Sequence, residues 1–344
     1  MQTSLRRQTL ITVCIANYNG MAVIDDCLRS ILAQQLDAGV VIKIIVHDDA
    51  STDGSVAHIG LQYPQVQLIV STENVGFCIA NNRMADAAAG DFLLLLNNDA
   101  ALFPDALQTL LCHAQTLGKP AILGLPQYSA ATGELIDIGS RLDPFLNPIP
   151  DLRRASHEAA MIIGACLWLP RRLWSDLGGF PEWFDSLAED MLLCCIARLH
   201  GHPVVALSES GFRHWVGASL GGGKITENRL STTARRRILS ERNKCFVMVL
   251  CYPAPWLQII LPVHLVLLLV EGSLLAALKR KASIFTTIYW NAVRALWQQR
   301  ERLVAMRRVV QAGRCTSAGV FFKPFSWLPH KLRLLVSHGV PEIR

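Results

Sequence analysis

The sequence predicts an α/β fold in which a mostly parallel mixed sheet is flanked by helices and is followed by a helical C-terminal region. Residues 10–125 alternate short apolar runs, typical of buried strands, with segments of helical spacing. This alternation favours parallel strands, because a helical crossover returns the chain to the same end of the sheet. The character of the sequence changes after Gly223, and we expect two domains, 1–230 and 231–344.

The elements of the first domain follow from apolar runs and from residues that end helices. Met21–Gln35 has apolar side chains at helical spacing. Arg171–Leu177 and Glu189–His200 are expected to be helices, since glycines follow both segments. The expected strands are Leu10–Ala16, Val40–Val46, Val66–Val70, Phe92–Leu96, Ala121–Leu125, Leu135–Ile138, Met161–Leu169 and Val204–Leu207.

The run Leu93–Leu96, which is followed by Asn97, Asn98 and Asp99, is the most informative segment. Four consecutive apolar residues indicate a strand that is buried on both faces. The polar triplet comes at the carboxyl end of this strand, where open α/β sheets bind ligands. A carboxylate at this position can hold a cation, and a cation that bridges a diphosphate would indicate nucleotide-linked substrates.

The cysteines and the N-terminus indicate a reducing environment. The ten cysteines are scattered, show no C-x-x-C spacing and mostly lie in apolar segments. We expect reduced thiols in the core, with neither a disulfide framework nor a zinc site. No signal peptide is visible, because residues 1–9 are few and polar and lead directly into an apolar strand. The first domain is therefore expected to face the cytoplasm.

Hydrophobic residues make up 51% of the chain, and the excess is concentrated between Cys245 and Leu278. A basic segment follows: residues 279–344 contain thirteen Lys or Arg and two Glu, a charge of +11 in a chain whose net charge is +6. A basic tail after an apolar segment favours an anionic membrane surface as a partner over nucleic acid. We expect no nucleic-acid partner.

Within this apolar segment, the clearest helix is Trp256–Leu278, with an interruption at Pro262. It is long enough to cross about 30 Å of hydrocarbon. Positive residues flank both of its ends, so a single span would carry the basic tail across the membrane against the positive-inside tendency. We therefore favour a peripheral or monotopic attachment to the cytoplasmic face of the inner membrane. A true span and a buried core or dimer surface are the alternatives.

The segment from Asp48 to Ser55 follows the second expected strand and is dense in carboxylates and hydroxyls. Most of it can be explained as a helix cap, with Ser51 or Asp53 as the capping residue. Asp48 emerges directly from the strand. It is the residue that could accept hydrogen bonds from a base or a ribose.

Two adjacent asparagines, Asn81 and Asn82, lie in a helical pattern that follows the segment Asn74–Phe77. Asparagine is a poor helix former, so its presence there needs a reason. Contact with a nucleotide is one explanation. A frayed helix start with exposed amides is the other.

Glu189 and Asp190 open an expected helix, where they can simply satisfy its amides and dipole. The upstream Gly178–Phe180 and an aromatic pair, Trp183 and Phe184, favour a functional role, because aromatic side chains could form a wall for a sugar. His214 precedes a glycine-rich stretch with basic residues nearby. This context favours a phosphate or metal role over a structural one.

Taken together, Ala16–Asn19, Asp48–Ser55, Asn74–Phe77 and Asn97–Asp99 resemble family 2 glycosyltransferases of the GT-A fold. The later elements are similar to the rhamnosyltransferase-like branch, and the resemblance covers roughly residues 10–245. These later elements are Gly164 and Ala165, Gly178–Phe180, Phe184, Glu189 and Asp190, and a His-x-x-Gly-x-Ser element at His214, Gly217 and Ser219.

The resemblance implies a role for each matching residue. Asp190, beside Glu189, would be the general base. Asp99 would bind a divalent metal, Mg²⁺ or Mn²⁺, on the donor diphosphate, with His214 as a further metal or diphosphate contact. The residues implied to bind the nucleotide sugar are Asn17, Asp48, Asn74, Gly76, Phe77, Asn81 and Asn98.

The chain departs from the family pattern at two positions. Asn97 stands where the D-x-D pattern has its first aspartate, and this change removes one carboxylate from the expected metal site. Pro181 stands where the branch often has aspartate after Gly-Gly-Phe.

The physical chemistry of glycosyl transfer agrees with these roles. A departing nucleoside diphosphate develops negative charge, which a divalent cation neutralises. A single carboxylate on the opposite face of the sugar accepts the acceptor proton and accounts for inversion. We therefore expect an inverting glycosyltransferase that uses a nucleotide-sugar donor of the dTDP-rhamnose or UDP-hexose type. The expected acceptor is a saccharide, in particular a lipid-linked one, in surface polysaccharide synthesis.

Two other functions stay open at this point. A nucleotidyltransferase that makes nucleotide sugars would need a basic, glycine-rich triphosphate loop near the first strand, and Ala16–Gly20 has no basic residue. A non-catalytic, membrane-associated protein that binds sugar nucleotides is the other alternative. Metal-dependent turnover distinguishes an enzyme from such a binding protein.

Overall fold

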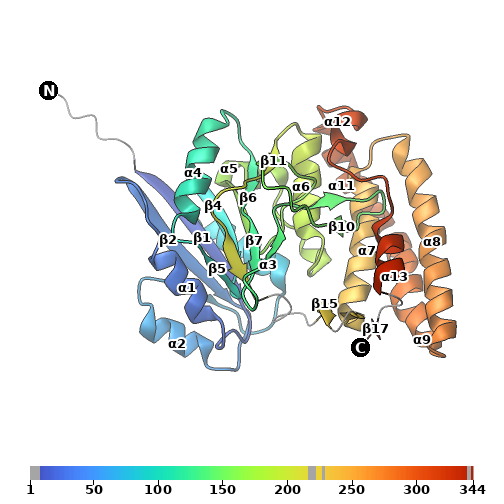
Figure 1. Cartoon of the computed structure of the whole chain (residues 1–344), viewed down its shortest axis with the longest axis horizontal. Coiled ribbons are helices and arrows are strands. Elements are labelled where there is room, and N and C mark those ends of the chain that lie inside the picture. Colours follow the sequence, from blue (N-terminus) through green and yellow to red (C-terminus); the bar gives the residue numbers. More distant parts are fainter. Residues whose placement is uncertain (1–7, 216–221, 227–228, 339–341, 344) are drawn as a thin grey trace. The chain divides into compact units, whose positions relative to one another are not determined.

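The computed structural model describes residues 8–215, 222–226, 229–338 and 342–343 (Figure 1). The chain divides into two compact units. Unit 1 is Met1–Gly139, Pro150–Asp185 and His202–Val216, and unit 2 is Ser140–Ile149, Ser186–Gly201 and Gly217–Arg344. Residues 140–149 and 186–201, which lie inside the expected domain 1–230, therefore fold with the C-terminal helices.

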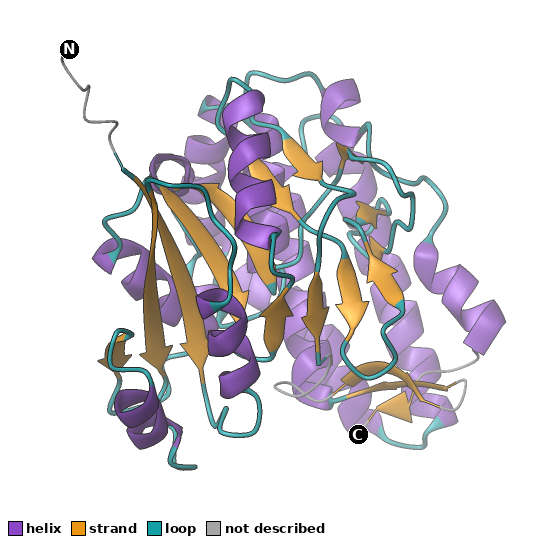
Figure 2. Cartoon of the chain, turned by 60° about the vertical axis from the view of Figure 1, so that its left-hand side comes forward, coloured by secondary structure: helices purple, strands orange, loops and turns teal. Residues whose placement is uncertain are grey.

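Unit 1 is built on a mixed sheet with helices packed against it, as the sequence predicts (Figure 2). Within the described residues this sheet has eight strands in the order β11-β13-β6-β12-β4-β1-β2-β3. β1 is parallel to both of its neighbours, whereas β12 is antiparallel to β4 and β6. The strands are β1 (Thr9–Asn17), β2 (Val40–Asp48), β3 (Gln67–Val70), β4 (Phe92–Asn97), β6 (Ile122–Gly124), β11 (His157–Glu158), β12 (Cys166–Pro170) and β13 (Val204–Ala206).

The centre of this sheet is formed by the apolar runs of the sequence. Leu93, Leu94, Leu95 and Leu96 of β4 are at most 2% exposed, which confirms that this strand is buried on both faces. Eight of the ten cysteines are buried, as expected from their apolar surroundings.

The longer helices of unit 1 bury apolar residues on one side. α1 buries Ile24, Cys27, Leu28 and Ile31, the spacing of one helical face. It is shorter at both ends than the expected 21–35, whereas α5 has its expected bounds. The helices are α1 (Ile24–Leu32), α2 (Ser55–Gln62), α3 (Phe77–Ala87), α4 (Ala106–Thr116) and α5 (Arg171–Leu177), with a 3₁₀ turn η1 (Glu182–Phe184).

A second sheet of unit 1, with the order β5-β14-β7-β8, is mostly absent from the sequence-based expectation. Its strands are β5 (Ala100–Leu102), β7 (Gln127–Ser129), β8 (Leu135–Asp137) and β14 (Phe212–His214). Only β8 was predicted. β7 and β14 contain polar residues and show no apolar run in the sequence.

The expected strand Met161–Leu169 is wrong in its first half, since β12 begins only at Cys166. The physical reason is a turn, in which the Cys166 amide donates to the Ile163 carbonyl at 3.3 Å. Gly164 and Ala165 therefore lie in this turn and not in the strand.

Unit 2 is mainly helical, with α7 as its central helix (Figure 1). α7 packs against α6, α10 and α11. The helices are α6 (Glu189–Leu199), α7 (Ala234–Cys251), α8 (Trp256–Leu278), α9 (Ala282–Ile284), the π-helical η2 (Phe285–Trp290), α10 (Asn291–Gln298), α11 (Arg300–Ala312), α12 (Ala318–Phe322) and α13 (His330–His338). The strands are β9 (Arg141–Leu142), β10 (Pro148–Ile149), β15 (Gly222–Thr226), β16 (Arg229–Thr232) and β17 (Glu342–Ile343).

α8 has the expected bounds, but it continues through Pro262 instead of being interrupted there. Pro262 lacks an amide hydrogen, so the carbonyl of Gln258 loses its helical partner. Both residues are exposed, so this carbonyl is not enclosed in the protein core.

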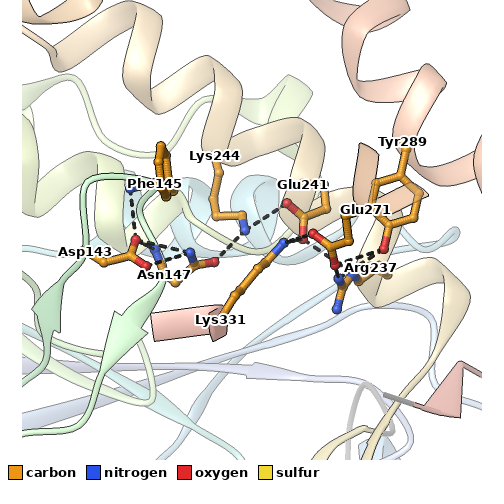
Figure 3. Close-up of polar contacts among 9 residues, drawn as sticks. All are labelled: Asp143, Phe145, Asn147, Arg237, Glu241, Lys244, Glu271, Tyr289 and Lys331. Atoms are coloured by element: carbon orange, nitrogen blue, oxygen red, sulfur yellow. Dashed lines mark hydrogen bonds and ion pairs between the residues drawn. The ribbon is translucent and has the colours of Figure 1, made fainter. Parts of the chain in front are cut away.

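A cluster of buried and partly buried charges joins α7, α8 and α13 (Figure 3). Glu241 and Lys244 are 2% and 3% exposed, and their charged groups lie 2.9 Å apart. Lys331 Nζ lies 2.7 Å from Glu241 and 2.9 Å from Glu271, and Arg237 pairs with Glu271. Burial acts to raise the pKa of Glu241, but the nearby cations outweigh it and hold this pKa well below 4.5.

Replacing Glu241 with glutamine (E241Q) is expected to lower the free energy of unfolding by about 3–5 kcal/mol, because its cationic partners lose a shared counter-charge. The folded-state pKa of Glu241 is depressed, so its stabilisation is present above pH 4.5 and is lost as the pH falls toward that lower pKa. Urea denaturation at neutral and acidic pH measures both effects. E301Q is the control, since the Glu301 side chain is 89% exposed and should contribute less than about 0.5 kcal/mol. An E241Q protein as stable as the wild type would contradict this role.

Candidate functional site

Polar residues lie together at the carboxyl ends of β1, β2 and β4. They are the residues that the sequence places at the first two strand ends and directly after Leu96. The parallel register pairs Asn17 with Asp48 and Ala16 with Asn97. The carboxyl ends of the three neighbouring strands therefore lie at one edge of the sheet. Asn98 and Asp99, 8% and 1% exposed, follow directly after β4.

The side chain of Asn17 links these strand ends. Its Nδ2 donates to Asp48 Oδ2 at 2.7 Å and to Ser55 Oγ at 3.1 Å. Its Oδ1 accepts from Asn98 Nδ2 at 2.9 Å, so donor and acceptor are both satisfied. A Cβ at Gly20 would lie 2.0 Å from Asn17 Oδ1 and 2.4 Å from Asn98 Nδ2. Glycine at position 20 is therefore needed for the bond between the two amides.

Asp48 lies fully buried beneath this edge, at 0% exposed. Its Oδ1 accepts from the Ser51 amide at 2.9 Å, and its Oδ2 accepts from the Ser51 hydroxyl at 2.7 Å as well as from Asn17. In this arrangement Asp48 organises the loop after β2. Its contact with a base or a ribose stays a prediction.

Asp49, to which the sequence analysis gave no role, holds the loop Asn74–Phe77. Its Oδ1 accepts from the Val75 amide at 2.7 Å, and its Oδ2 accepts from the Gly76 amide at 2.9 Å. Gly76 has φ +89°, a conformation that favours glycine. The signal for this role was the adjacent pair of aspartates, because consecutive residues at a strand end point to opposite sides.

The loop that Asp49 holds carries three of the expected nucleotide-binding residues. Asn74 is exposed, whereas Gly76 and Phe77 are half-buried. The ring of Phe77 stacks against Phe180 with centroids 6.1 Å apart. Their roles toward a nucleotide stay predictions.

The two helical asparagines have different partners. Asn81 is 1% exposed, and its Nδ2 donates to the Phe77 carbonyl within α3 at 2.9 Å. Asn82 accepts from the Phe180 amide at 3.0 Å and donates to the Phe180 carbonyl at 2.8 Å. Asn82 therefore anchors the Gly-Gly-Phe turn, and neither side chain is an exposed amide at a frayed start. The expected contact between Asn81 and a nucleotide stays a prediction.

Asp99 and His214, the two residues expected to contact the metal, lie side by side, and their role toward a metal stays a prediction. His214 Nε2 is 3.1 Å from Asp99 Oδ1, because β14 runs antiparallel to β5 and places His214 opposite Ala100. Gln127 of β7 lies on the other side of the imidazole, with its Nε2 2.9 Å from His214 Nδ1. Gln127 could not be singled out from the sequence, because β7 has no periodic pattern.

This pair fits a divalent cation. Two ligands that each lie about 2.1 Å from one octahedral cation are about 3 Å apart when adjacent, close to the 3.1 Å measured here. If the Gln127 amide is turned by 180°, its oxygen accepts from the Nδ1–H of His214. Nε2 of His214 then carries no hydrogen and can bind the cation. No group of three His, Cys, Asp or Glu side chains suited to a metal occurs within the described residues. A cation held here would thus need oxygen ligands from a diphosphate, or water.

Glu189 and Asp190 open α6 in unit 2 and are 6% and 9% exposed. Asp190 Oδ1 accepts from the Met191 amide at 2.7 Å. This carboxylate therefore satisfies one amide at the helix N-terminus, which is the alternative to a catalytic role that the sequence left open. Burial lowers the pKa of Arg236 on α7, and the charges of Asp190 and Glu189 oppose this shift. The two carboxylates therefore lie within the field of a cation. The catalytic role of Asp190 stays a prediction.

The aromatic pair Trp183 and Phe184 is described by the structure, whereas the His-x-x-Gly-x-Ser element is described only in part. Phe184 is 0% exposed and belongs to the core, whereas Trp183 is half-buried, with its ring 4.8 Å from that of Phe184. Gly217 and Ser219 of the His-x-x-Gly-x-Ser element lie outside the described residues. In the glycine-rich stretch that follows, Gly222 begins strand β15.

Comparison with known proteins relates a segment of this chain to a family. Residues 12–177 match the family model described as glycosyl transferase family 2. The succinoglycan biosynthesis protein ExoO of Rhizobium meliloti is 32% identical over 109 residues, which are 31% of this chain and 30% of that protein. The chain spans less than a third of the length of the curated relatives that it matches first.

Solved structures resemble the fold at low sequence identity. GalNAc-T7 with UDP, GalNAc and Mn²⁺ matches with a TM-score of 0.56 and 14% identity, over 73% of this chain and 49% of that one. S. aureus TarS 1–349 in complex with UDP matches with a TM-score of 0.53 and 14% identity, over 92% of this chain and 90% of that one. The rhamnosyltransferase-like branch stays a prediction. Residues 12–177 of this chain belong to glycosyltransferase family 2, and the fold is GT-A.

Proposed function

We propose that this chain is an inverting, metal-dependent glycosyltransferase that moves a sugar from a nucleotide-diphosphate donor to a saccharide acceptor. The observation that carries the proposal is the group Asn17, Asp48, Asn98 and Asp99 at the ends of β1, β2 and β4 in the family segment. Both solved neighbours contain UDP, and one of them contains Mn²⁺. These ligands support a nucleoside-diphosphate donor and a divalent cation here.

In the proposed reaction, the acceptor hydroxyl oxygen attacks the anomeric carbon of the donor while the bond from that carbon to the diphosphate oxygen breaks. Asp190, beside Glu189, accepts the hydroxyl proton. The nucleoside diphosphate leaves with the bonding electron pair. Because attack and departure take place on opposite faces, the configuration of the sugar is inverted.

Asp99 and His214 are the residues that would hold the metal. A divalent cation there supplies positive charge to the diphosphate as negative charge builds on it. Gln127 fixes the orientation of the His214 ring through Nδ1, and Asp48 and Asn17 shape the loops around the nucleotide. These residues would bind and orient the donor, whereas Asp190 would accept the proton of the acceptor hydroxyl.

The proposed donor is of the dTDP-rhamnose or UDP-hexose type, and the proposed acceptor is a lipid-linked saccharide in surface polysaccharide synthesis. The name of the Rhizobium meliloti relative supports polysaccharide synthesis. A lipid-linked acceptor requires an enzyme that works at a membrane. The support for membrane attachment comes from α8.

α8 is long and apolar enough to cross a membrane, and only 28% of its most apolar window is buried in the structure. Its exposed apolar residues recur at helical spacing along one side, whereas its carboxylate Glu271 pairs with Arg237 and Lys331 of the same unit. Lys279, Arg280 and Lys281 follow directly and are exposed. An apolar face next to cations is typical of a helix that lies on an anionic membrane. The exposed apolar residues are Ile259, Val263, Val266, Leu267, Val270, Leu274 and Leu278.

We therefore propose a peripheral or monotopic attachment to the cytoplasmic face of the inner membrane. The limited burial of α8 weighs against the core-helix alternative. The pairing of Glu271 on one side of the helix weighs against a span, because lipid would surround a spanning helix.

The double variant V266Q/V270Q should bind vesicles about 10- to 100-fold more weakly than the wild type, because two valines that are 60% and 50% exposed no longer enter the lipid. Flotation with vesicles of phosphatidylserine and phosphatidylcholine measures the binding. L61Q is the matched control, since Leu61 is an apolar residue on α2 that is 76% exposed. Unchanged binding of the double variant, or an α8-dependent dimer in analytical ultracentrifugation, would count against a lipid partner.

Asp190→Asn should reduce transfer by about 10²- to 10⁴-fold and leave donor binding intact, because only the proton acceptor is lost.

The donor for this test is selected by a turnover screen across nucleotide sugars with Mg²⁺ or Mn²⁺. EDTA should abolish the activity of the wild type. Calorimetry with the selected nucleotide diphosphate measures binding. Asp176→Asn is the control, since this carboxylate is 60% exposed. Full turnover by Asp190→Asn would remove the base assignment, and donor binding without any wild-type turnover would indicate a non-catalytic binding protein.

A further inference from the structure

We infer that Asn243 on α7 is a positioning residue, which holds the turn that carries the base Asp190. This inference rests on the proposed function, because it concerns the geometry of that base. Asn243 lies inside an 18-residue helix and is 0% exposed. Asparagine is unfavourable in a helix interior, so a fully buried one needs a compensating set of contacts.

These contacts go to the residues that precede α6. Asn243 Nδ2 donates to the carbonyl oxygen of Ser186 at 2.9 Å and to that of Leu187 at 2.7 Å. Arg242 Nε donates to Asn243 Oδ1 at 2.9 Å. The amide orientation is thereby determined, because its oxygen faces a donor and its nitrogen faces two acceptors. An aspartate of the same size could not replace it, since a carboxylate has no donor for the two carbonyls.

The turn that Asn243 holds is strained. Leu187 and Ala188 have φ values of +70° and +66°, in the left-handed region that residues with a Cβ disfavour. Ala188 is the N-cap of α6 and provides no side-chain capping bond. Such a conformation persists where its surroundings impose it, and the amide of Asn243 supplies part of that restraint from another helix.

The strained turn leads directly to the two carboxylates. Glu189 and Asp190 are the residues after Ala188, so the path of this turn sets where their side chains begin. Arg236 precedes Asn243 by seven residues, about two helical turns, and so shares its face of α7. The charges of Asp190 and Glu189 act on Arg236, which places that face of α7 next to the start of α6. One face of α7 therefore supports both the turn and the carboxylates.

A displacement of the base by about 1 Å can reduce a rate by about 100-fold, because a proton acceptor works only in a narrow geometry. Loss of the Asn243 amide should therefore lower the turnover number and leave donor binding unchanged. A purely structural role predicts a different result. It would lower the melting temperature without a selective loss of turnover.

The test compares Asn243→Ala and Asn243→Asp with Asn147→Ala in the full chain. Asn147 is a matched control, because it is a buried asparagine of unit 2 whose Nδ2 donates to Asp143 and whose Oδ1 accepts from Lys244. With the donor found in the screen, both Asn243 variants should lose about 100-fold in kcat, with the donor KM within twofold of the wild type. Hydrogen–deuterium exchange of the amides at 187–191 should accelerate in both. Asn147→Ala should lower the melting temperature and leave kcat and this exchange unchanged.

A folded Asn243→Asp or Asn243→Ala protein with wild-type kcat would overturn the inference, as would an equal loss of kcat in Asn147→Ala. If Asn243→Ala does not fold, the isosteric Asn243→Asp decides. The proposed function has its own test: it stands if Asp190→Asn is inactive whatever the Asn243 variants do. If Asp190→Asn turns over normally, the base assignment fails and takes this inference with it.

Discussion

The parallel register of β1 with its two neighbours is the constraint on which the candidate site of unit 1 depends. The register places Asn17 opposite Asp48 and Ala16 opposite Asn97, so three strands end together. The Asn17 amide then donates to Asp48 and accepts from Asn98. A shift of one residue in either pairing would turn the partner side chain to the other face of the sheet and break this link.

The sequence predicted the elements whose pattern reports burial over many residues. The strands β1, β2 and β4 appeared as apolar runs, and α5 and α8 appeared with their observed bounds. The strands β5, β7 and β14 did not appear, and β7 and β14 contain polar residues that leave no apolar run. These strands bring His214 to Asp99, although 115 residues separate them in the chain. The resemblance named both residues of this pair, but nothing in the sequence pointed to Gln127.

The asparagines show why residue types are easier to single out than their partners. An amide offers both donors and an acceptor, so it can serve a nucleotide, its own helix or a distant backbone segment equally well. Asn81 bonds within its helix, whereas Asn82 bonds Phe180, which is 98 residues away. Asn243 attracted no attention because charged residues flank it, and its partners lie 56 and 57 residues earlier. Only tertiary packing distinguishes these cases.

For α8, too, the amino-acid composition does not determine how the helix lies relative to protein and membrane. A high mean hydropathy alone does not show whether α8 crosses a membrane, lies on it or packs against protein. The distribution of exposure is different, because lipid surrounds a spanning helix whereas an interfacial helix has a protein side and a lipid side. In α8, Glu271 and His264 lie on the protein side, and His264 is 4% exposed. Burial lowers the pKa of His264 to about 3, so this side chain is neutral at physiological pH. The two ionisable residues of α8 thus pack within unit 2, and the face left for a membrane is mostly apolar.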